Sequence, residues 1–248
     1  MFIFVVPLKG RASSSNWRVT AELCERATAS MLANPSPDVR VILVCNEIPD
    51  HLPVDPRLMV RSIVTPIPKD KSEMMADKFI KFKTGLVLAR EFAPGWLMRA
   101  DADDLISTKL ASFIHDQAPG QFWYSESGWL HQLGSRFVIK QNRFHVHCGT
   151  SNLAYVTQAD LPESIDSRAE NCYLLTQAHN VIVDSRKAAG VQVRPIPFPT
   201  TVYILNSGEN WSGTWLRTHH DRRTRLKLIF KTRLITRNLR REFGLWPI

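Results

Sequence analysis

The sequence predicts an α/β fold with a mostly parallel central sheet and a smaller, partly antiparallel part beyond residue 120. Strand-like and helix-like segments alternate over the first hundred residues, an order that is typical of parallel sheets. The apolar stretch Trp96–Ala100 then ends in three carboxylates, Asp101, Asp103 and Asp104. Because open α/β sheets bind ligands at the carboxyl ends of their strands, this acidic run marks the expected site.

The individual elements follow from hydrophobic periodicity. The helix at 16–33 has apolar residues at a spacing of four and begins at a capping residue, Ser15 or Asn16. A buried parallel strand is expected to be a continuous apolar run, as Val39–Cys45 is. The expected strands are 2–6, 39–45, 58–64, 96–100, 121–124, 128–133 and 136–139, with extended segments at 149–156 and 191–203, and the expected helices are 16–33, 73–92, one capped by Ser107, 166–180 and 221–243.

Length and composition limit the protein class. The chain has 248 residues, of which 44% are hydrophobic, enough for one large domain or one domain with an appendage. Its four cysteines form no CxxC pair, which argues against a cysteine zinc site and fits a reducing cytosol. Residues 2–6 are expected to be a buried strand rather than a signal peptide, and no segment approaches the roughly 20 apolar residues of a membrane span. We therefore expect a cytoplasmic protein, with peripheral association to the inner face of the cell membrane.

The net charge of +9 is concentrated near the C-terminus. Between Arg217 and Phe243 ten Lys and Arg face two acidic residues, a net +8, which leaves +1 for the rest of the chain. Apolar residues at about four-residue spacing predict a basic amphipathic helix over 221–243 that binds an anionic membrane surface. The alternative is a helix that packs on the body. Because the body is near neutral and the tail has few aromatic residues, no nucleic acid is expected as a partner.

The acidic run predicts a divalent metal. Carboxylates packed this closely repel one another unless a cation lies among them, and oxygen ligands suit Mg²⁺ or Mn²⁺ bound to a diphosphate. We expect Asp101, Asp103 and Asp104 as metal ligands. The alternative is an acidic first turn of a helix, a role that Asp104 would fill.

Besides the acidic run, several short motifs follow one another along the chain. They are Val5–Leu8, Asp77–Lys78 with Gly85, Cys148–Ser151, Ala178–His179, Pro195–Pro199 with Val202–Tyr203, and Gly208–Asn210. With these elements and motifs in order, the chain resembles nucleotide-sugar glycosyltransferases of the GT-A fold, in the bacterial family-2-like group.

The similarity covers residues 1 to about 213. It implies a Rossmann-like catalytic domain over 1–216, with a nucleotide-binding half at about 1–106 and an acceptor half at about 107–216, followed by a basic tail at 217–248. It also implies that Asp101 contacts the nucleotide and ribose, and that Asp103 holds the metal on the diphosphate.

Several other residues are candidates for binding the nucleotide sugar. Lys78 and Lys81 share a helix face with Gly85, where two amines would contact phosphate or uracil, although an Asp77–Lys81 surface pair would explain Lys81 equally. Lys9 and Arg11 follow the first strand, and the alternative to a binding role for them is a solvated loop. For Asn46 the alternative is a turn. The full set is Pro7, Lys9, Arg11, Asn46, Lys78, Lys81, Asp101 and Ala102.

No residue stands out as the general base. Family-2 inverting enzymes commonly keep their base in a Glu-Asp pair on a later helix, and no clear pair of this kind follows here. Asp166 and Glu170, four residues apart on the helix expected at 166–180, are the first candidates, and Glu163 is a third. His179 is expected to complete the metal shell or to orient an acceptor. The alternative is a histidine that caps a helix or packs in the core. We count Asp166, Glu170 and His179 as the catalytic candidates.

The expected function is metal-dependent transfer of a sugar from a nucleoside diphosphate sugar to a hydroxyl of a glycan or lipid-linked acceptor, with Mn²⁺ or Mg²⁺ as cofactor. One alternative is a sugar-phosphate nucleotidyltransferase, although the N-terminal region lacks the Gly-rich phosphate loop expected of it. The other is a nucleic-acid-binding protein that acts through its basic tail.

Overall fold

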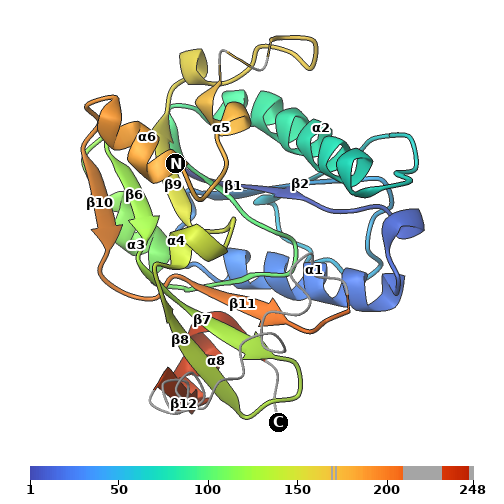
Figure 1. Ribbon diagram of the computed structural model, residues 1–248, viewed down its shortest axis with the longest axis vertical. Coiled ribbons are helices and arrows are strands. Elements are labelled where there is room, and N and C mark those ends of the chain that lie inside the picture. The colour runs from blue at the N-terminus through green and yellow to red at the C-terminus, as the bar shows by residue number, and fades with distance from the viewer. Residues whose placement is uncertain (169, 171, 209–230, 246–248) are drawn as a thin grey trace.

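A computed structural model describes residues 1–168, 170, 172–208 and 231–245. Within these residues the chain forms a mixed α/β structure with two sheets: a larger one covered by helices on both faces, and a smaller one beside it (Figure 1). The strands are β1 (Phe2–Pro7), β2 (Val39–Cys45), β3 (Leu58–Ser62), β4 (Gly95–Arg99), β5 (Leu105–Ile106), β6 (Phe122–Ser125), β7 (Ser127–Gln132), β8 (Phe137–Asn142), β9 (Asn152–Val156), β10 (Val193–Ile196), β11 (Thr201–Leu205) and β12 (Thr232–Leu234). The α-helices are α1 (Trp17–Leu32), α2 (Lys71–Ala89), α3 (Leu110–His115), α4 (Phe144–His147), α5 (Tyr173–Thr176), α6 (Ile182–Ala188) and α8 (Arg237–Phe243).

The larger sheet has the strand order β10-β6-β9-β4-β1-β2-β3. Strands β1 to β4 run parallel, and β9 runs antiparallel to both of its neighbours, β4 and β6. All six residues of β1 are buried, as expected for a parallel strand covered on both faces. This sheet takes strands from both sides of residue 106, so the two predicted halves share it.

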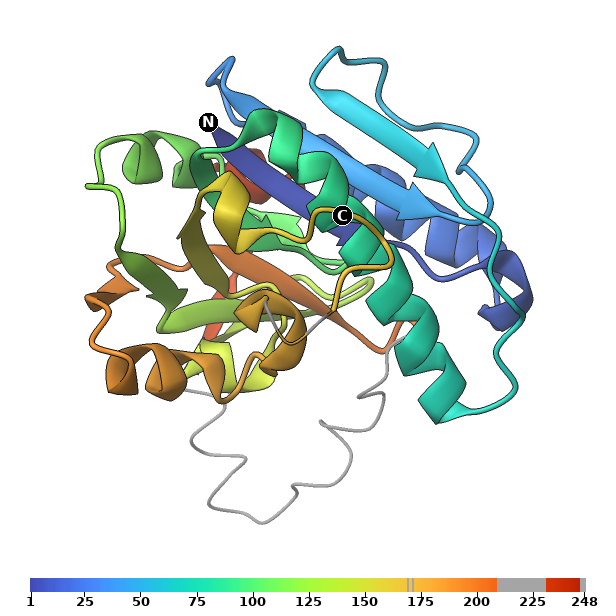
Figure 2. The same cartoon turned by 90° about the horizontal axis from the view of Figure 1, so that it is seen from above.

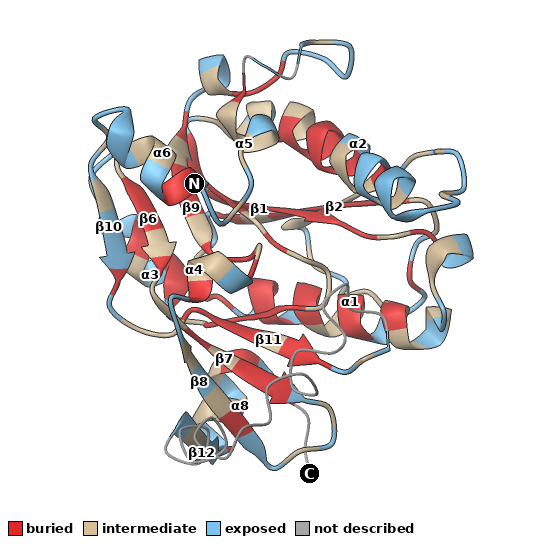
Figure 3. Ribbon diagram, in the orientation of Figure 1, coloured by how far each residue is buried: buried red, intermediate tan, exposed pale blue. Residues whose placement is uncertain are grey.

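Helices cover the two faces of this sheet in separate groups. Apolar residues of α1 and α3 pack on one face and those of α2 and α6 on the other (Figures 1 and 2). Gly85 lets α2 lie close to the sheet, since a Cβ at this position would collide with the side chain of Val5. The buried residues therefore form layers on both sides of β1 and β2 (Figure 3).

The smaller sheet has the order β12-β8-β7-β11-β5, in which only the β7–β11 pair is parallel among the described strands. Its core includes the side of α1 that bears Leu23, together with residues from β5, β8 and β11. Ile235, Phe243 and Leu245 complete this core, with exposed fractions of 7%, 1% and 6%. The end of the predicted tail is therefore part of the globular body.

The early elements confirm the sequence predictions. The strands expected at 2–6, 39–45, 58–64 and 96–100 and the helices expected at 16–33 and 73–92 lie within three residues of their predicted ends. Asn16 caps α1, because its side-chain oxygen accepts a hydrogen bond from the Val19 amide at 3.4 Å. The helix expected from Ser107 begins instead at Leu110, and the Ser107 side chain donates a hydrogen bond to Glu242.

Two predicted helices are wrong. In place of a helix over 166–180, the described residues there form turns and the single-turn helix α5. In place of a continuous helix over 221–243, residues Thr232–Leu234 form β12 against β8, and a short helix, α8, follows. Residues 209–230, the rest of the predicted tail, lie outside the described residues. Across the described ranges, no helix is both long enough and apolar enough to span a bilayer.

Candidate functional site

The acidic run lies at the point where the strand order of the larger sheet reverses. β1 has β2 on one side and β4 on the other, and in open α/β sheets ligands bind at the carboxyl ends of the strands at such a reversal. The amide of Ala100 donates to the carbonyl of Val5 at 3.0 Å. The residues after β4 therefore lie beside Pro7 and the loop that follows β1, which places two sequence-predicted segments together.

Helix α2 adds a cation beside the acidic run. Lys78 Nζ lies 2.7 Å from Asp101 Oδ1 in an ion pair. The Lys78 side chain is 40% exposed and that of Asp101 is 20% exposed, so both remain accessible to a ligand. The amide of Asp101 donates to Thr150 Oγ1 at 2.8 Å, which fixes the start of the acidic run.

The three carboxyl groups of the run have different electrostatic environments. Burial raises the pKa of Asp101, but the nearby charges of Lys78 and Arg99 outweigh it and hold that pKa below its usual value. Burial, reinforced by the charge of Asp101, raises the pKa of Asp103 to about 6. Burial also raises the pKa of Asp104 well above its usual value. Of the two partly exposed carboxylates, Asp101 and Asp103, Asp103 is therefore the one whose ionised form is less compensated by nearby cations.

Asp104 faces the interior. It is fully buried, its Oδ2 accepts the Cys148 thiol at 3.2 Å, and its Oδ1 has no hydrogen-bond partner among the described residues. Across that same part of the chain, no three His, Cys, Asp or Glu side chains gather into a group that could hold a metal. The acidic run thus does not form a three-carboxylate cage.

Two residues from the second half of the chain, Gly149 and His179, lie near Asp101. Gly149 packs so closely that a Cβ there would lie 3.1 Å from Asp101 Oδ2 and 3.4 Å from an Arg99 nitrogen. His179 lies in a turn between α5 and α6. Burial and the charge of Arg99 lower the pKa of His179, against the opposing effect of Asp101. Sequence reasoning missed Arg99, although its position at the end of β4 was a usable signal.

Lys81 and Asn46 serve a structural network. Lys81 is fully buried and its Nζ lies 2.6 Å from Asp77 Oδ2. Asp77 Oδ1 accepts the Thr65 hydroxyl at 2.6 Å, and Asn46 Nδ2 donates to Thr65 Oγ1 at 2.8 Å and to the Ile63 carbonyl at 3.0 Å. The network fixes the loop after β3 against the end of β2, and Lys81 does not reach the surface beside the acidic run.

The remaining predicted binding residues lie around the same strand ends. Lys9 is close enough to lower the pKa of Asp103 against the larger effect of burial. The Arg11 amide donates to Glu47 at 2.9 Å, and its guanidinium lies 5.3 Å from the centre of the Trp17 ring. Ala102 is partly buried against the core beneath α1.

The two carboxylates proposed as general bases are not on a common helix. Asp166 lies in an exposed turn and Glu170 is exposed beyond it. Lys83 Nζ donates to the Ser167 carbonyl at 2.5 Å, which holds this turn beside α2. The predicted pairing of Asp166 with Glu170 on one helix face is therefore wrong, because the helix that would align them is absent from the described residues.

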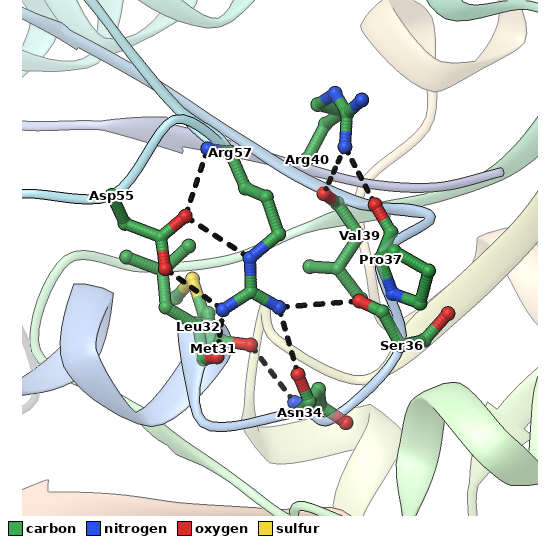
Figure 4. A network of polar contacts seen from close by, with 9 residues as sticks. All are labelled: Met31, Leu32, Asn34, Ser36, Pro37, Val39, Arg40, Asp55 and Arg57. Atoms are coloured by element: carbon green, nitrogen blue, oxygen red, sulfur yellow. Dashed lines mark hydrogen bonds and ion pairs between the residues drawn. The ribbon is translucent and has the colours of Figure 1, made fainter.

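A surface depression of about 600 Å³ lies at the opposite end of the sheet, beside the amino ends of β2 and β3. Arg57 lines this depression, and every N–H of its side chain already donates a hydrogen bond (Figure 4). Its acceptors are Asp55 and three main-chain carbonyls at and after the end of α1, the shortest of these contacts being 2.6 Å to Leu32. This arrangement fastens the end of α1 to β3 and leaves no Arg57 donor for a ligand.

No protein-family model matches the chain, and no curated protein matches it. Among solved structures, the crystal structure of S. aureus TarS, a glycosyltransferase, matches with a TM-score of 0.41 and 13% sequence identity. The match covers 82% of this chain and 36% of the TarS chain. A likeness at this level assigns neither a fold family nor an activity, so the functional argument rests on the geometry of the acidic run.

Proposed function

We propose that this protein is a metal-dependent enzyme that transfers a sugar from a nucleoside diphosphate sugar to a hydroxyl group of a glycan or lipid-linked acceptor. One observation carries the proposal: Asp101 and Asp103 lie at the reversal of strand order, with the Lys78 ammonium 2.7 Å from Asp101. The carboxyl ends of the strands at such a reversal are a nucleotide-binding position in open α/β sheets. The sequence resemblance to GT-A glycosyltransferases points to the same residues.

The donor set of the acidic run fits Mg²⁺ or Mn²⁺ shared with a diphosphate. The pKa of Asp103 rises to about 6 through burial and repulsion by Asp101, which is the situation that a bound cation relieves. Mg²⁺ commonly takes one or two carboxylates together with substrate phosphates, so a closed protein cage is not required. Asp103 would hold the metal, and the metal would supply charge that stabilises the diphosphate leaving group.

The residues around Asp103 have complementary roles in this proposal. Lys78 and Lys9 offset the negative charge of the phosphates. Asp101 remains ionised, because Lys78 and Arg99 hold its pKa low against the effect of burial, and it accepts hydrogen bonds from ribose hydroxyls. The interior carboxyl of Asp104 supports the turn through its bond with Cys148.

We propose His179 as the general base, whose imidazole takes the proton from the acceptor hydroxyl. Burial lowers the pKa of its imidazole, so the ring is neutral at pH 7 and able to accept a proton. The ring is partly exposed, and it lies within electrostatic range of Asp101 and Arg99. His179→Asn is expected to lower turnover strongly while the affinity for the donor stays within about twofold; Asp166→Asn and Glu170→Gln are the matched variants for the other candidates.

Part of the basic tail remains available for an anionic membrane surface. Leu234 at the end of β12 is 58% exposed and faces Phe137 of β8, which is 48% exposed. Arg136, Arg233 and Arg237 flank this pair and are exposed, and the described residues from 231 to 241 contain no Asp or Glu. An apolar pair among arginines suits the headgroup boundary of an anionic bilayer.

The test is a thermal-shift screen of UDP, GDP and their sugars with and without Mn²⁺, followed by assay of nucleoside diphosphate release. A nucleotide at 100 times its Kd should stabilise the fold by about 2.7 kcal/mol. Stabilisation by diphosphate sugars that requires Mn²⁺ supports the proposal. Stabilisation by nucleoside triphosphates alone, with release of pyrophosphate, would favour the nucleotidyltransferase, and no response to any nucleotide would overturn both.

A further inference from the structure

Helix α8 binds the segment that follows the acidic run. Both carboxylate oxygens of Glu242 accept hydrogen bonds: Ser107 Oγ lies 2.6 Å from Oε1 and Lys109 Nζ lies 2.7 Å from Oε2. The Glu242 carbonyl also accepts the amide of Thr108 at 3.0 Å. Three consecutive residues thus bind one residue, which stands 135 positions after Ser107.

The segment between the acidic run and Ser107 consists of β5, which has two residues and pairs only with β11 among the described strands. Leu105 and Ile106 are fully buried in the cores beside α1. The Ile106 amide donates to Ser30 Oγ at 2.9 Å, and the Ser107 amide donates to the Thr200 carbonyl at 2.8 Å. The three contacts with Glu242 add to this restraint at the end of the segment that is farther from the acidic run.

We infer that Glu242 is a positioning residue for the acidic run. Thr150 fixes the start of the run by accepting the Asp101 amide at 2.8 Å, and Glu242 fixes its exit through the buried hydroxyl of Ser107. Both anchors come from parts of the chain remote in sequence. A site that binds charged phosphate groups needs its carboxylates held within about 0.5 Å, which supporting hydrogen bonds provide. This inference rests on the proposed function in one respect, the role of Asp103 in binding a metal–diphosphate complex.

The test compares four full-length proteins: wild type, Ser107→Ala, Glu242→Ala and Lys187→Met. Lys187→Met is the control, since Lys187 does not contact Glu242, its side chain is 52% exposed and exposed ion pairs contribute little. Two quantities are measured: amide hydrogen exchange along the chain without ligand, and the Kd of UDP and of GDP with and without Mn²⁺.

In Ser107→Ala and Glu242→Ala, exchange is expected to accelerate at residues 101–109, while the core strands β1 and β2 stay at wild-type rates. The Mn²⁺-dependent Kd is expected to rise about tenfold in these two variants and to stay within twofold of wild type in Lys187→Met. Unchanged exchange at 101–109, or equal acceleration throughout the chain, would overturn the positioning role. If wild type binds neither nucleotide, the proposed function fails, and the exchange measurement still decides whether Glu242 holds the run.

Discussion

Lys78 Nζ lies 2.7 Å from Asp101 Oδ1, so a lysine on helix α2 and the first carboxylate of the acidic run form one ion pair across the carboxyl end of β4. In the proposed function, this ion pair holds the lysine beside the diphosphate of the donor. Its ammonium is available to phosphate oxygens without a change of the helix, because 40% of the side chain is exposed.

Replacing Lys78 tests whether it contacts phosphate. Lys78→Met is expected to raise the Kd of UDP in the presence of Mn²⁺ about tenfold, the value of one charge-assisted contact of about 1.4 kcal/mol. The need for Mn²⁺ should remain. Lys187→Met is the matched control, since Lys187 forms an exposed pair with Asp184 at 3.6 Å. Calorimetry that gives the same Kd for wild type and Lys78→Met would remove Lys78 from the site.

Replacing Asp103 tests the metal. Asp103→Asn keeps the size of the side chain and removes its charge, so Mn²⁺-dependent binding of UDP should be lost while the melting temperature stays near that of wild type. Asp116→Asn is the control, because the Asp116 side chain is 81% exposed. Equal Mn²⁺-dependent affinity in wild type and Asp103→Asn, measured by calorimetry, would contradict the assignment.

Lys81 should matter for stability rather than for binding. Removing one partner of a buried ion pair costs about 3–5 kcal/mol, because the other charge stays buried without compensation. Lys81→Met is therefore expected to lower the free energy of unfolding in urea by that amount. The double variant Lys81→Met, Asp77→Leu should recover part of the loss. A decrease in the free energy of unfolding below about 1 kcal/mol, which is typical of exposed ion pairs, would contradict this prediction.

His131 should make stability depend on pH. Burial lowers its pKa, with a further contribution from Arg240, against a hydrogen bond to the Phe137 carbonyl. The unfolded chain therefore takes up a proton at His131 at a higher pH than the folded protein does. Stability should fall as pH decreases below about 6.5, toward the lower pKa of the folded state. His131→Gln should reduce the drop in melting temperature between pH 7.5 and 5.5; an identical drop would mean that other groups carry it.

Membrane binding should depend on the exposed arginines around β12. The triple variant Arg233→Gln, Arg237→Gln, Arg241→Gln should lower co-sedimentation with vesicles that contain anionic lipid, and raised salt should weaken wild-type binding because charges are screened beyond about 8 Å at physiological ionic strength. Neutral vesicles and the variant Arg18→Gln, Arg26→Gln serve as controls. Wild-type protein that ignores anionic vesicles at low salt would refute the prediction. Point variants are preferable to truncation, since Phe243 and Leu245 are buried.

The first half of the fold could be predicted because its signals are local. Val39–Cys45 is a continuous apolar run, and Asn16 precedes a periodic helix; both features act within a few residues. The helix over 221–243 was wrong because Leu226, Phe230 and Leu234 have helical spacing, whereas pairing with β8 imposes a strand on Thr232–Leu234. Tertiary pairing of this kind overrides local periodicity.

The candidate site also has a part that local sequence patterns predict and a part that only tertiary contacts determine. The acidic run and Lys78 were identified from sequence, since a buried strand that ends in carboxylates is a local pattern. The spacing of three residues between Lys78 and Lys81 indicated a shared role, yet Lys78 reaches Asp101 while Lys81 is buried with Asp77. The contacts of Asp104 with Cys148 and of Ser107 with Glu242 join residues 44 and 135 positions apart, and no spacing rule reports them.

The packing of Ile235, Phe243 and Leu245 has a consequence for synthesis of the chain. The larger sheet needs strands only as far as β10, which ends at Ile196, so it is able to assemble while later residues are still being translated. The core of the smaller sheet stays open until residues 235–245 leave the ribosome, and until then Leu105, Val138 and Val202 have an uncovered apolar side. Exposed surface of this kind favours aggregation, so residues 235–245 protect the nascent protein when they cover it.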